Sequence, residues 1–257
     1  MSIYDRLLAI TAIIPPFVLL WYAERFERRV REPTQSWRYR VFACAGLATI
    51  PIAWLERAVN PLVESAAEPI ATLLESFLVA AAIEETGKFT CLLLLTRGAL
   101  GPRTRYGAFL YALHASMGFA LVENVIAMLK VPDMVSFSTR FFLRAYMTVP
   151  MHLVAGGTLG YLWAKRRFDA GALGIAGGTA LAIAIHGTFN TMLLGIERLP
   201  EGHETLQVVC ASVAMAIPLA GLLILRVCAG RLRELDHRDG QVEPVRGRIR
   251  RRRADLV

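Results

Sequence analysis

Residues 73–95 read LLESFLVAAAIEETGKFTCLLLL, an apolar run of membrane-spanning length that is interrupted by Glu84, Glu85 and Lys88. A charged side chain in the hydrocarbon of a bilayer is energetically costly, so charged residues inside such a run indicate a functional site. Three later apolar runs carry polar residues of their own, and these are Glu123 with Asn124, then His152, then His186 with Asn190. We therefore predict that four successive helices contribute acid, base and amide groups to one buried site.

The composition predicts an all-α, polytopic integral membrane protein. Of the 257 residues, 55% are hydrophobic, and the mean hydropathy is +0.45. There are seven apolar runs, and they comprise residues 3–23, 41–55, 72–95, 107–129, 141–164, 171–196 and 207–229. Most of them approach or exceed the ~20 residues that a helix needs to cross a bilayer. We predict a transmembrane domain over residues 1–230, with the core of the site in the third to sixth spans, residues 72–196. The second run is short and contains Pro51, and residues 57–71 are predicted to form an external loop.

The distribution of basic residues predicts the orientation in the membrane. Lys and Arg accumulate in short loops on the cytoplasmic side. Four connecting segments are strongly basic, namely residues 24–40, 97–105, 165–167 and 230–257, whereas the segments between them carry one or two basic residues each. The N-terminus is therefore predicted to be outside and the C-terminus inside, a pattern that suits a bacterial inner membrane. The basic segment 231–257 is predicted to be a disordered cytoplasmic tail that contacts anionic lipids rather than nucleic acid.

This orientation allows an estimate of the depth of each polar residue from the helical rise of ~1.5 Å per residue. Glu84, Glu85, His152 and His186 all lie about ten to twelve residues from the outer end of their spans, which places them at one level. A second group, Glu123, Asn124 and Asn190, is predicted to lie one to two turns nearer the outside. The polar residues therefore form one layer in the outer half of the membrane.

The spacing of the charged residues predicts their pairing. Lys88 follows Glu84 by four residues, on the same face of a helix, and is expected to neutralise it. Glu85 is then left uncompensated, as suits a group that takes and gives protons. Arg144 is expected either to extend towards the membrane surface or to pair with Glu123. His114 has no polar companion in its run and is assigned to structure or to support of the site residues.

Several chemistries use such a set of residues. Hydrolysis of an amide bond needs a carboxylate that activates water, a group that protonates the leaving amine and a donor that faces the oxyanion. The same residues could bind zinc, with His152, His186 and Glu85 as ligands, although no HExxH motif supports this and we favour direct activation of water by a carboxylate. A proton- or ion-coupled transporter, or a binding protein without catalytic activity, remains an alternative.

The order of these motifs resembles the PrsW family of intramembrane proteases, which are in turn similar to the CAAX prenyl proteases. The resemblance rests on E-E-x-x-K at residues 84–88, G-F-x-x-x-E-N at residues 118–124, the isolated His152 and H-x-x-x-N at residues 186–190. It implies a glutamate-dependent protease that cleaves single-pass membrane proteins, such as anti-sigma factors, near the outer face. Relatives often have an acidic residue where this chain has Arg105.

The residues and the resemblance together define the expected roles. Glu85 is the general base, with Glu84 as its partner, and Lys88 tunes the pair. His152 and His186 position the water and protonate the leaving amine. The supporting residues are Asn190 and Asn124, which would stabilise the oxyanion, and Glu123, which is either a second acid or a support for the other residues.

Overall fold

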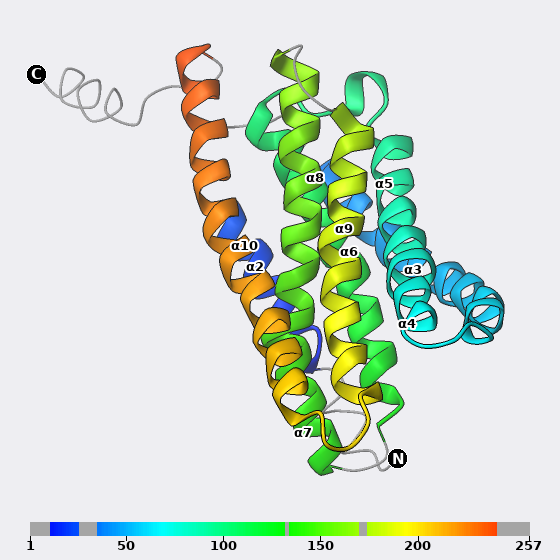
Figure 1. The fold of residues 1–257 in the computed structure, drawn as a ribbon. Helices are drawn as coiled ribbons and strands as arrows, with labels where there is room; N and C mark the ends of the chain where they lie inside the picture. The colour runs from blue at the N-terminus through cyan, green and yellow to red at the C-terminus, as the bar shows by residue number, and fades with distance from the viewer. Residues whose placement is uncertain (1–10, 26–34, 132–133, 170–173, 241–257) are drawn as a thin grey trace, which may run out of the picture.

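The computed structural model describes residues 11–25, 35–131, 134–169 and 174–240, and within these ranges every regular element is helical. The long helices run side by side as a bundle, with α6 and α8 inside it (Figure 1). The all-α architecture predicted from the sequence is therefore confirmed.

Twelve helical elements make up the described chain. In order they are α2 (Ile14–Glu24), α3 (Gln35–Glu64), α4 (Ile70–Leu74), the π-helix η1 (Glu75–Ala82), α5 (Ile83–Leu95), the 3-10 helix η2 (Gly98–Leu100), α6 (Arg105–Leu129), α7 (Met134–Leu143), the π-helix η3 (Arg144–Thr148), α8 (Val149–Asp169), α9 (Gly174–Arg198) and α10 (Glu204–Arg238).

Small residues let the central helices approach closely. A Cβ atom added to Gly160 on α8 would lie 2.8 Å from Cβ of Ala112 on α6, and one added to Gly156 would collide with Ser116. Gly156 and Gly160 therefore form a notch at small-xxx-small spacing, which is typical of helix contacts in membranes. This contact fixes α8 against α6, and both helices carry polar residues of the predicted site.

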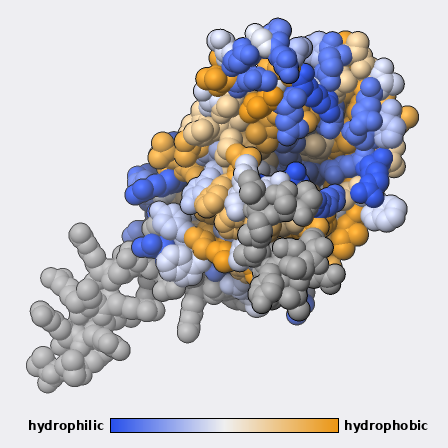
Figure 2. Space-filling model, turned by 90° about the horizontal axis from the view of Figure 1, so that it is seen from below, coloured by the Kyte–Doolittle hydropathy of each residue, from blue (hydrophilic) through white to orange (hydrophobic). Residues whose placement is uncertain are grey.

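The outer faces of the bundle are apolar, as expected of an integral membrane protein. Four helices are long and apolar enough to cross a membrane, and they comprise residues 36–64, 105–129, 174–198 and 204–238. Large exposed hydrophobic side chains lie along α3 and α10, including Trp54 and Val227. Seen along the bundle from the end where α7 lies, hydrophilic residues gather beside hydrophobic ones on the end face (Figure 2). The protein is thus polytopic, and the predicted total of seven spans stays a prediction, because residues 3–10 of the first span lie outside the described residues.

Two predicted boundaries are wrong. The second apolar run was expected to end at residue 55 and to be followed by a loop, but α3 continues to Glu64 with Pro51 and Pro61 inside it. Proline is tolerated in such helices because neighbouring groups satisfy the freed backbone carbonyls. The seventh helix also continues past residue 230 to Arg238, with Leu232 and Asp236 buried. The predicted tail is therefore helical over residues 231–238, and its remainder from residue 241 lies outside the described residues.

The third and fifth predicted spans each change from π-helix to α-helix partway along. The π-helix η1 ends immediately before α5, and η3 ends immediately before α8. A π-helical segment is rare and often occurs at functional sites, because its wider turn shifts the side chains that follow it around the helix. Both π-helices directly precede helices that carry predicted site residues.

Candidate active site

Three charged side chains of α5 form the centre of the buried site. Lys88 Nζ donates to Glu85 Oε1 at 2.7 Å and to Glu84 Oε2 at 3.2 Å, and all three residues are at most 6% exposed. The expectation that Lys88 serves Glu84 alone and leaves Glu85 uncompensated is wrong. Side chains that are three or four residues apart are neighbours on the surface of a helix, so one lysine reaches both carboxylates.

His152 connects this centre to α6. Its Nδ1 atom lies 3.0 Å from Lys88 Nζ, and its Nε2 atom lies 2.8 Å from Glu123 Oε2. A lysine ammonium has only donors, so His152 Nδ1 accepts a hydrogen bond from Lys88 and His152 Nε2–H donates one to the Glu123 carboxylate. Glu123 therefore bonds directly to a residue of the central layer, whereas the depth estimate had placed it one to two turns away.

His186 on α9 completes the cluster from the opposite side. Its Nδ1 atom lies 2.8 Å from Glu85 Oε1 and 4.0 Å from Glu84 Oε2. The His186 and His152 rings meet edge to face, with 5.1 Å between centroids. Within the described chain, Nδ1 is the His186 nitrogen that contacts these carboxylates. The predicted convergence of the third, fifth and sixth spans on one site is thus present in the structure.

The four central residues fit a metal ion in donor type and in spacing. One ligand atom each from Glu84, Glu85, His152 and His186 lies within 4.8 Å of the other three. Imidazole nitrogens combined with a carboxylate oxygen are a common zinc-binding set. Each histidine also has one ring nitrogen on a carboxylate, an arrangement that orients histidine ligands in metal sites. A metal ion would compete with the Lys88 ammonium for the same oxygen atoms.

Comparison with known proteins agrees with this geometry. The family model described as "PrsW family intramembrane metalloprotease" matches residues 33–220, which include all of the residues above. The chain belongs to the PrsW family. No curated protein and no solved structure matches the chain.

The PrsW resemblance included the segment G-F-x-x-x-E-N, and the structure explains its first two residues. Gly118 lies against the backbone of Phe42 on α3, where a Cβ atom would collide with the carbonyl group. Phe119 places its ring 4.2 Å from Lys88 Nζ, in a cation–π contact beneath the cluster. The glycine therefore brings α6 close to α3, and the phenylalanine stabilises the buried ammonium group.

The two asparagines that were expected to stabilise an oxyanion differ in their surroundings. Asn124 is already engaged, because its Oδ1 accepts from Arg144 Nε at 2.6 Å and its Nδ2 donates to the Ala12 carbonyl at 3.3 Å. Arg144 also pairs with Glu123 at 2.7 Å, which is one of the two alternatives expected for it. Asn190 is half-buried one helical turn from His186, and its amide makes no hydrogen bond within the described ranges.

The sequence analysis missed Glu56 on α3. Its carboxylate is within electrostatic range of Lys88, Glu123 and Glu84. Its Oε1 atom is buried and has no hydrogen-bond partner among the described residues. The residue was overlooked because α3 was expected to end at residue 55. A helix drawn through Pro51 would have placed this acid in the membrane beside the other charges.

Two other polar residues that the sequence analysis singled out lie outside the site. His114 was expected to have no polar companion, but its Nε2 atom lies 2.9 Å from Glu24 Oε1 on α2. Arg105, the departure from the family pattern, binds Asp169 Oδ1 through Nε at 2.8 Å and pairs with Asp239 at 2.7 Å. None of these three partners could be found from local spacing, because all three are distant in the sequence from the residue that they contact.

Proposed function

We propose that this PrsW protein is an intramembrane endopeptidase that hydrolyses a peptide bond of a single-pass membrane protein, such as an anti-sigma factor. The observation that supports the proposal most strongly is the convergence of Glu84, Glu85, His152 and His186 within 4.8 Å inside a membrane protein. A site whose only task was structural would not need two histidines, each with one ring nitrogen on a different carboxylate, Glu123 for His152 and Glu85 for His186.

The cluster is proposed to hold a zinc ion through His152, His186 and Glu84. When bound, such an ion polarises water and the substrate carbonyl as a Lewis acid. This proposal differs from the metal-free mechanism favoured by the sequence alone. It is supported by the family description and by the donor set, in which each histidine is already oriented by a carboxylate.

Glu85 is proposed as the general base. Its carboxylate takes a proton from the attacking water as the water oxygen bonds to the substrate carbonyl carbon. The same carboxylate then returns the proton to the leaving amide nitrogen, and the carbon–nitrogen bond breaks. Lys88 and His186, which both bond Glu85 Oε1, hold the carboxylate in position during these transfers.

Asn190 is proposed to stabilise the oxyanion. Its amide is one turn from His186 on α9, and no described residue forms a hydrogen bond with it. Asn124 is not proposed for this role because both ends of its amide are engaged. With the N-terminus outside and the basic tail in the cytoplasm, the reaction takes place in the outer half of the membrane.

Cleavage in reconstituted vesicles tests the function. The purified protein is combined in liposomes with a single-pass reporter protein, and the products are identified by mass spectrometry. We expect cleavage within or near the transmembrane segment, loss of activity with a zinc chelator and recovery with added zinc. Metal content of the purified protein is measured in parallel.

Two results would contradict parts of the proposal. Full activity in protein that contains no metal would return the mechanism to direct activation of water by the carboxylates. Proton or ion flux through the vesicles without cleavage of any single-pass protein would favour the transporter alternative.

A further inference from the structure

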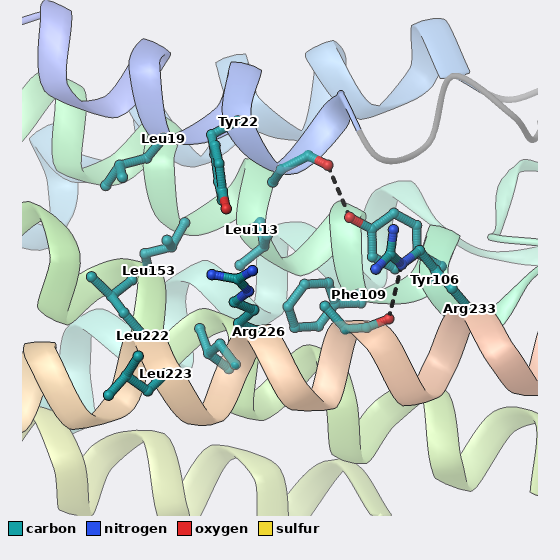
Figure 3. A pocket seen from close by; sticks show the side chains of 13 residues that line it. Leu19, Tyr22, Tyr106, Phe109, Leu113, Leu153, Leu222, Leu223, Arg226 and Arg233 are labelled. Carbon is teal, nitrogen blue, oxygen red and sulfur yellow. Dashed lines mark hydrogen bonds between the residues drawn. The ribbon is translucent and has the colours of Figure 1, made fainter.

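A cavity separate from the candidate active site lies among α2, α6, α8 and α10 (Figure 3). It has a volume of about 370 Å³, within the size range of ligand pockets. Its walls are mostly aliphatic and aromatic, and they include Leu19, Phe109, Leu113, Leu153, Leu222 and Leu225. None of the catalytic cluster residues lines it.

One part of this cavity is basic and aromatic. Arg226 and Arg233 of α10 line it together with Tyr22 and Tyr106. Arg233 lies 5.6 Å from the Tyr106 ring centroid, and Tyr106 in turn donates to the Ala23 carbonyl at 2.9 Å. Figure 3 shows Arg226 reaching from α10 towards Tyr22 on α2. No acidic residue is found among the lining residues, so the described cavity wall carries a net positive charge.

The sequence of α10 places the basic part at the membrane interface. Residues 208–225 contain no charged side chain, and Arg226 is the first charge after this apolar stretch. A run of this length approximately spans the hydrocarbon, so Arg226 lies where the helix enters the headgroup region. Tyrosine is also enriched at this level of membrane proteins. The aliphatic part of the cavity therefore faces acyl chains, and the basic part faces headgroups.

We propose that this cavity binds one anionic phospholipid. The phosphate group would be held by the guanidinium groups of Arg226 and Arg233, which suit the geometry of phosphate oxygens. An acyl chain would occupy the apolar part beside Leu113 and Leu153. Basic pockets between transmembrane helices recognise anionic headgroups in this way. The leaflet is the one on the side of the basic C-terminal segment.

The apolar walls distinguish a lipid from a free phosphate. A soluble phosphate ion would gain nothing from the leucine and phenylalanine side chains, whereas an acyl chain buries apolar surface against them. The absence of an acid from the described wall also disfavours a zwitterionic headgroup, whose cationic part would find no carboxylate.

Native mass spectrometry of the whole purified protein tests the proposal. Phosphatidylglycerol and phosphatidylcholine with identical acyl chains are titrated separately, and bound lipid is counted per protein. We expect one phosphatidylglycerol to bind more tightly than phosphatidylcholine. Arg226→Gln is expected to weaken the phosphatidylglycerol site about fivefold, the effect of one basic residue near a membrane surface. Equal binding of the two lipids would overturn the proposal.

Matched variants separate this site from general electrostatic attraction. Arg231→Gln removes a charge from the same helix, but Arg231 lines a different surface together with Val227 and Glu234. The affinity of this variant for phosphatidylglycerol should therefore equal that of the unchanged protein. Ala229→Phe keeps both arginines and fills part of the cavity, so it should weaken binding of phosphatidylglycerol at least as much as Arg226→Gln does. Gly230→Phe is its control, since a side chain there meets open space.

Two further outcomes would overturn the proposal. Equal losses in Arg226→Gln and Arg231→Gln would show attraction to α10 as a whole rather than to the cavity. Displacement of bound phosphatidylglycerol by soluble glycerol phosphate at similar concentrations would show that the arginines bind phosphate without using the apolar walls.

Discussion

Two buried charged clusters in this bundle have opposite characters. The cluster around Lys88 lies within continuous helical stretches, because η1 runs directly into α5 and η3 into α8, and its hydrogen bonds connect side chains to side chains. The cluster around Arg105 lies at the start of α6 and the ends of α8 and α10. There Asp236 accepts from the backbone N–H groups of Arg105 at 2.9 Å and Tyr106 at 2.8 Å.

The difference follows from where backbone groups are available. The first N–H groups of a helix have no partner within the helix, so a carboxylate at that end is satisfied by the backbone and stabilises the helix. In mid-helix the backbone groups bond one another, and buried side chains must satisfy each other. A mid-helix cluster such as the one around Lys88 leaves ring nitrogens and carboxylates close together and able to exchange protons. The comparison teaches that position along the helix separates a structural cluster from a reactive one.

The largest expected effect comes from removing the proposed base in the mid-helix cluster. Glu85→Gln is expected to lower the rate of reporter cleavage by about 10³-fold, since an amide cannot take the proton from water. His186→Ala should have a similar effect because it loses both a proposed ligand and the contact with Glu85. Initial rates in reconstituted vesicles provide the measurement.

The control for this variant is Glu75→Gln, in the same predicted span. Glu75 pairs with Arg198 in a partly exposed position away from the cluster. The rate of reporter cleavage by the Glu75→Gln variant should stay within about twofold of the rate of the unchanged protein, as expected when a surface ion pair is lost. If the Glu85→Gln variant cleaves the reporter at the normal rate, Glu85 is not the general base.

An intermediate effect is expected for Glu123→Gln. The carboxylate bonds His152 Nε2 and does not touch the proposed water position, so it orients a ligand rather than handling protons. Loss of such a partner lowers metal affinity or activity by about 10- to 100-fold. Zinc titration of the purified variant and cleavage rates are measured together.

The exposed Glu64→Gln, at the end of α3, is the matched control and should change neither quantity. If Glu123→Gln lowers thermal stability but leaves zinc affinity unchanged, the mid-helix cluster has a structural part after all, and the comparison with the Arg105 cluster weakens.

The smallest effect on activity is expected at the Arg105 cluster. Asp236→Ala removes the acceptor for two backbone N–H groups and should lower the free energy of unfolding by about 2 kcal/mol. Cleavage per folded molecule should be unchanged, because the change leaves the Lys88 cluster intact. Thermal unfolding in detergent measures the stability. The cleavage rate is divided by the amount of folded protein to give cleavage per folded molecule.

Glu234→Ala on the same helix serves as the control. Its exposed pair with Arg238 is worth at most about 0.5 kcal/mol. A loss of cleavage in Asp236→Ala that exceeds its loss of folded protein would mean that the two clusters are coupled.

The sequence alone determined the class of the protein and the identity of the central residues. Apolar runs of membrane length predict helices because a bilayer leaves the backbone no other partners. Glu84, Glu85, His152 and His186 could be found because a polar residue in such a run is costly and therefore conspicuous. Of the two alternatives expected for Arg144, the structure shows the pair with Glu123.

The tertiary structure decided how these residues are connected. Spacing along one helix allows Lys88 to reach both carboxylates, but it could not show the contact of Lys88 with His152, because that contact joins α5 to α8. The partners of His114 and Arg105, and the approach of Glu56, likewise come from helices far apart in the sequence. Hydropathy fixes which segments enter the membrane, but side-chain contacts between helices depend on their packing and rotation, which notches such as Gly118 and Gly160 set.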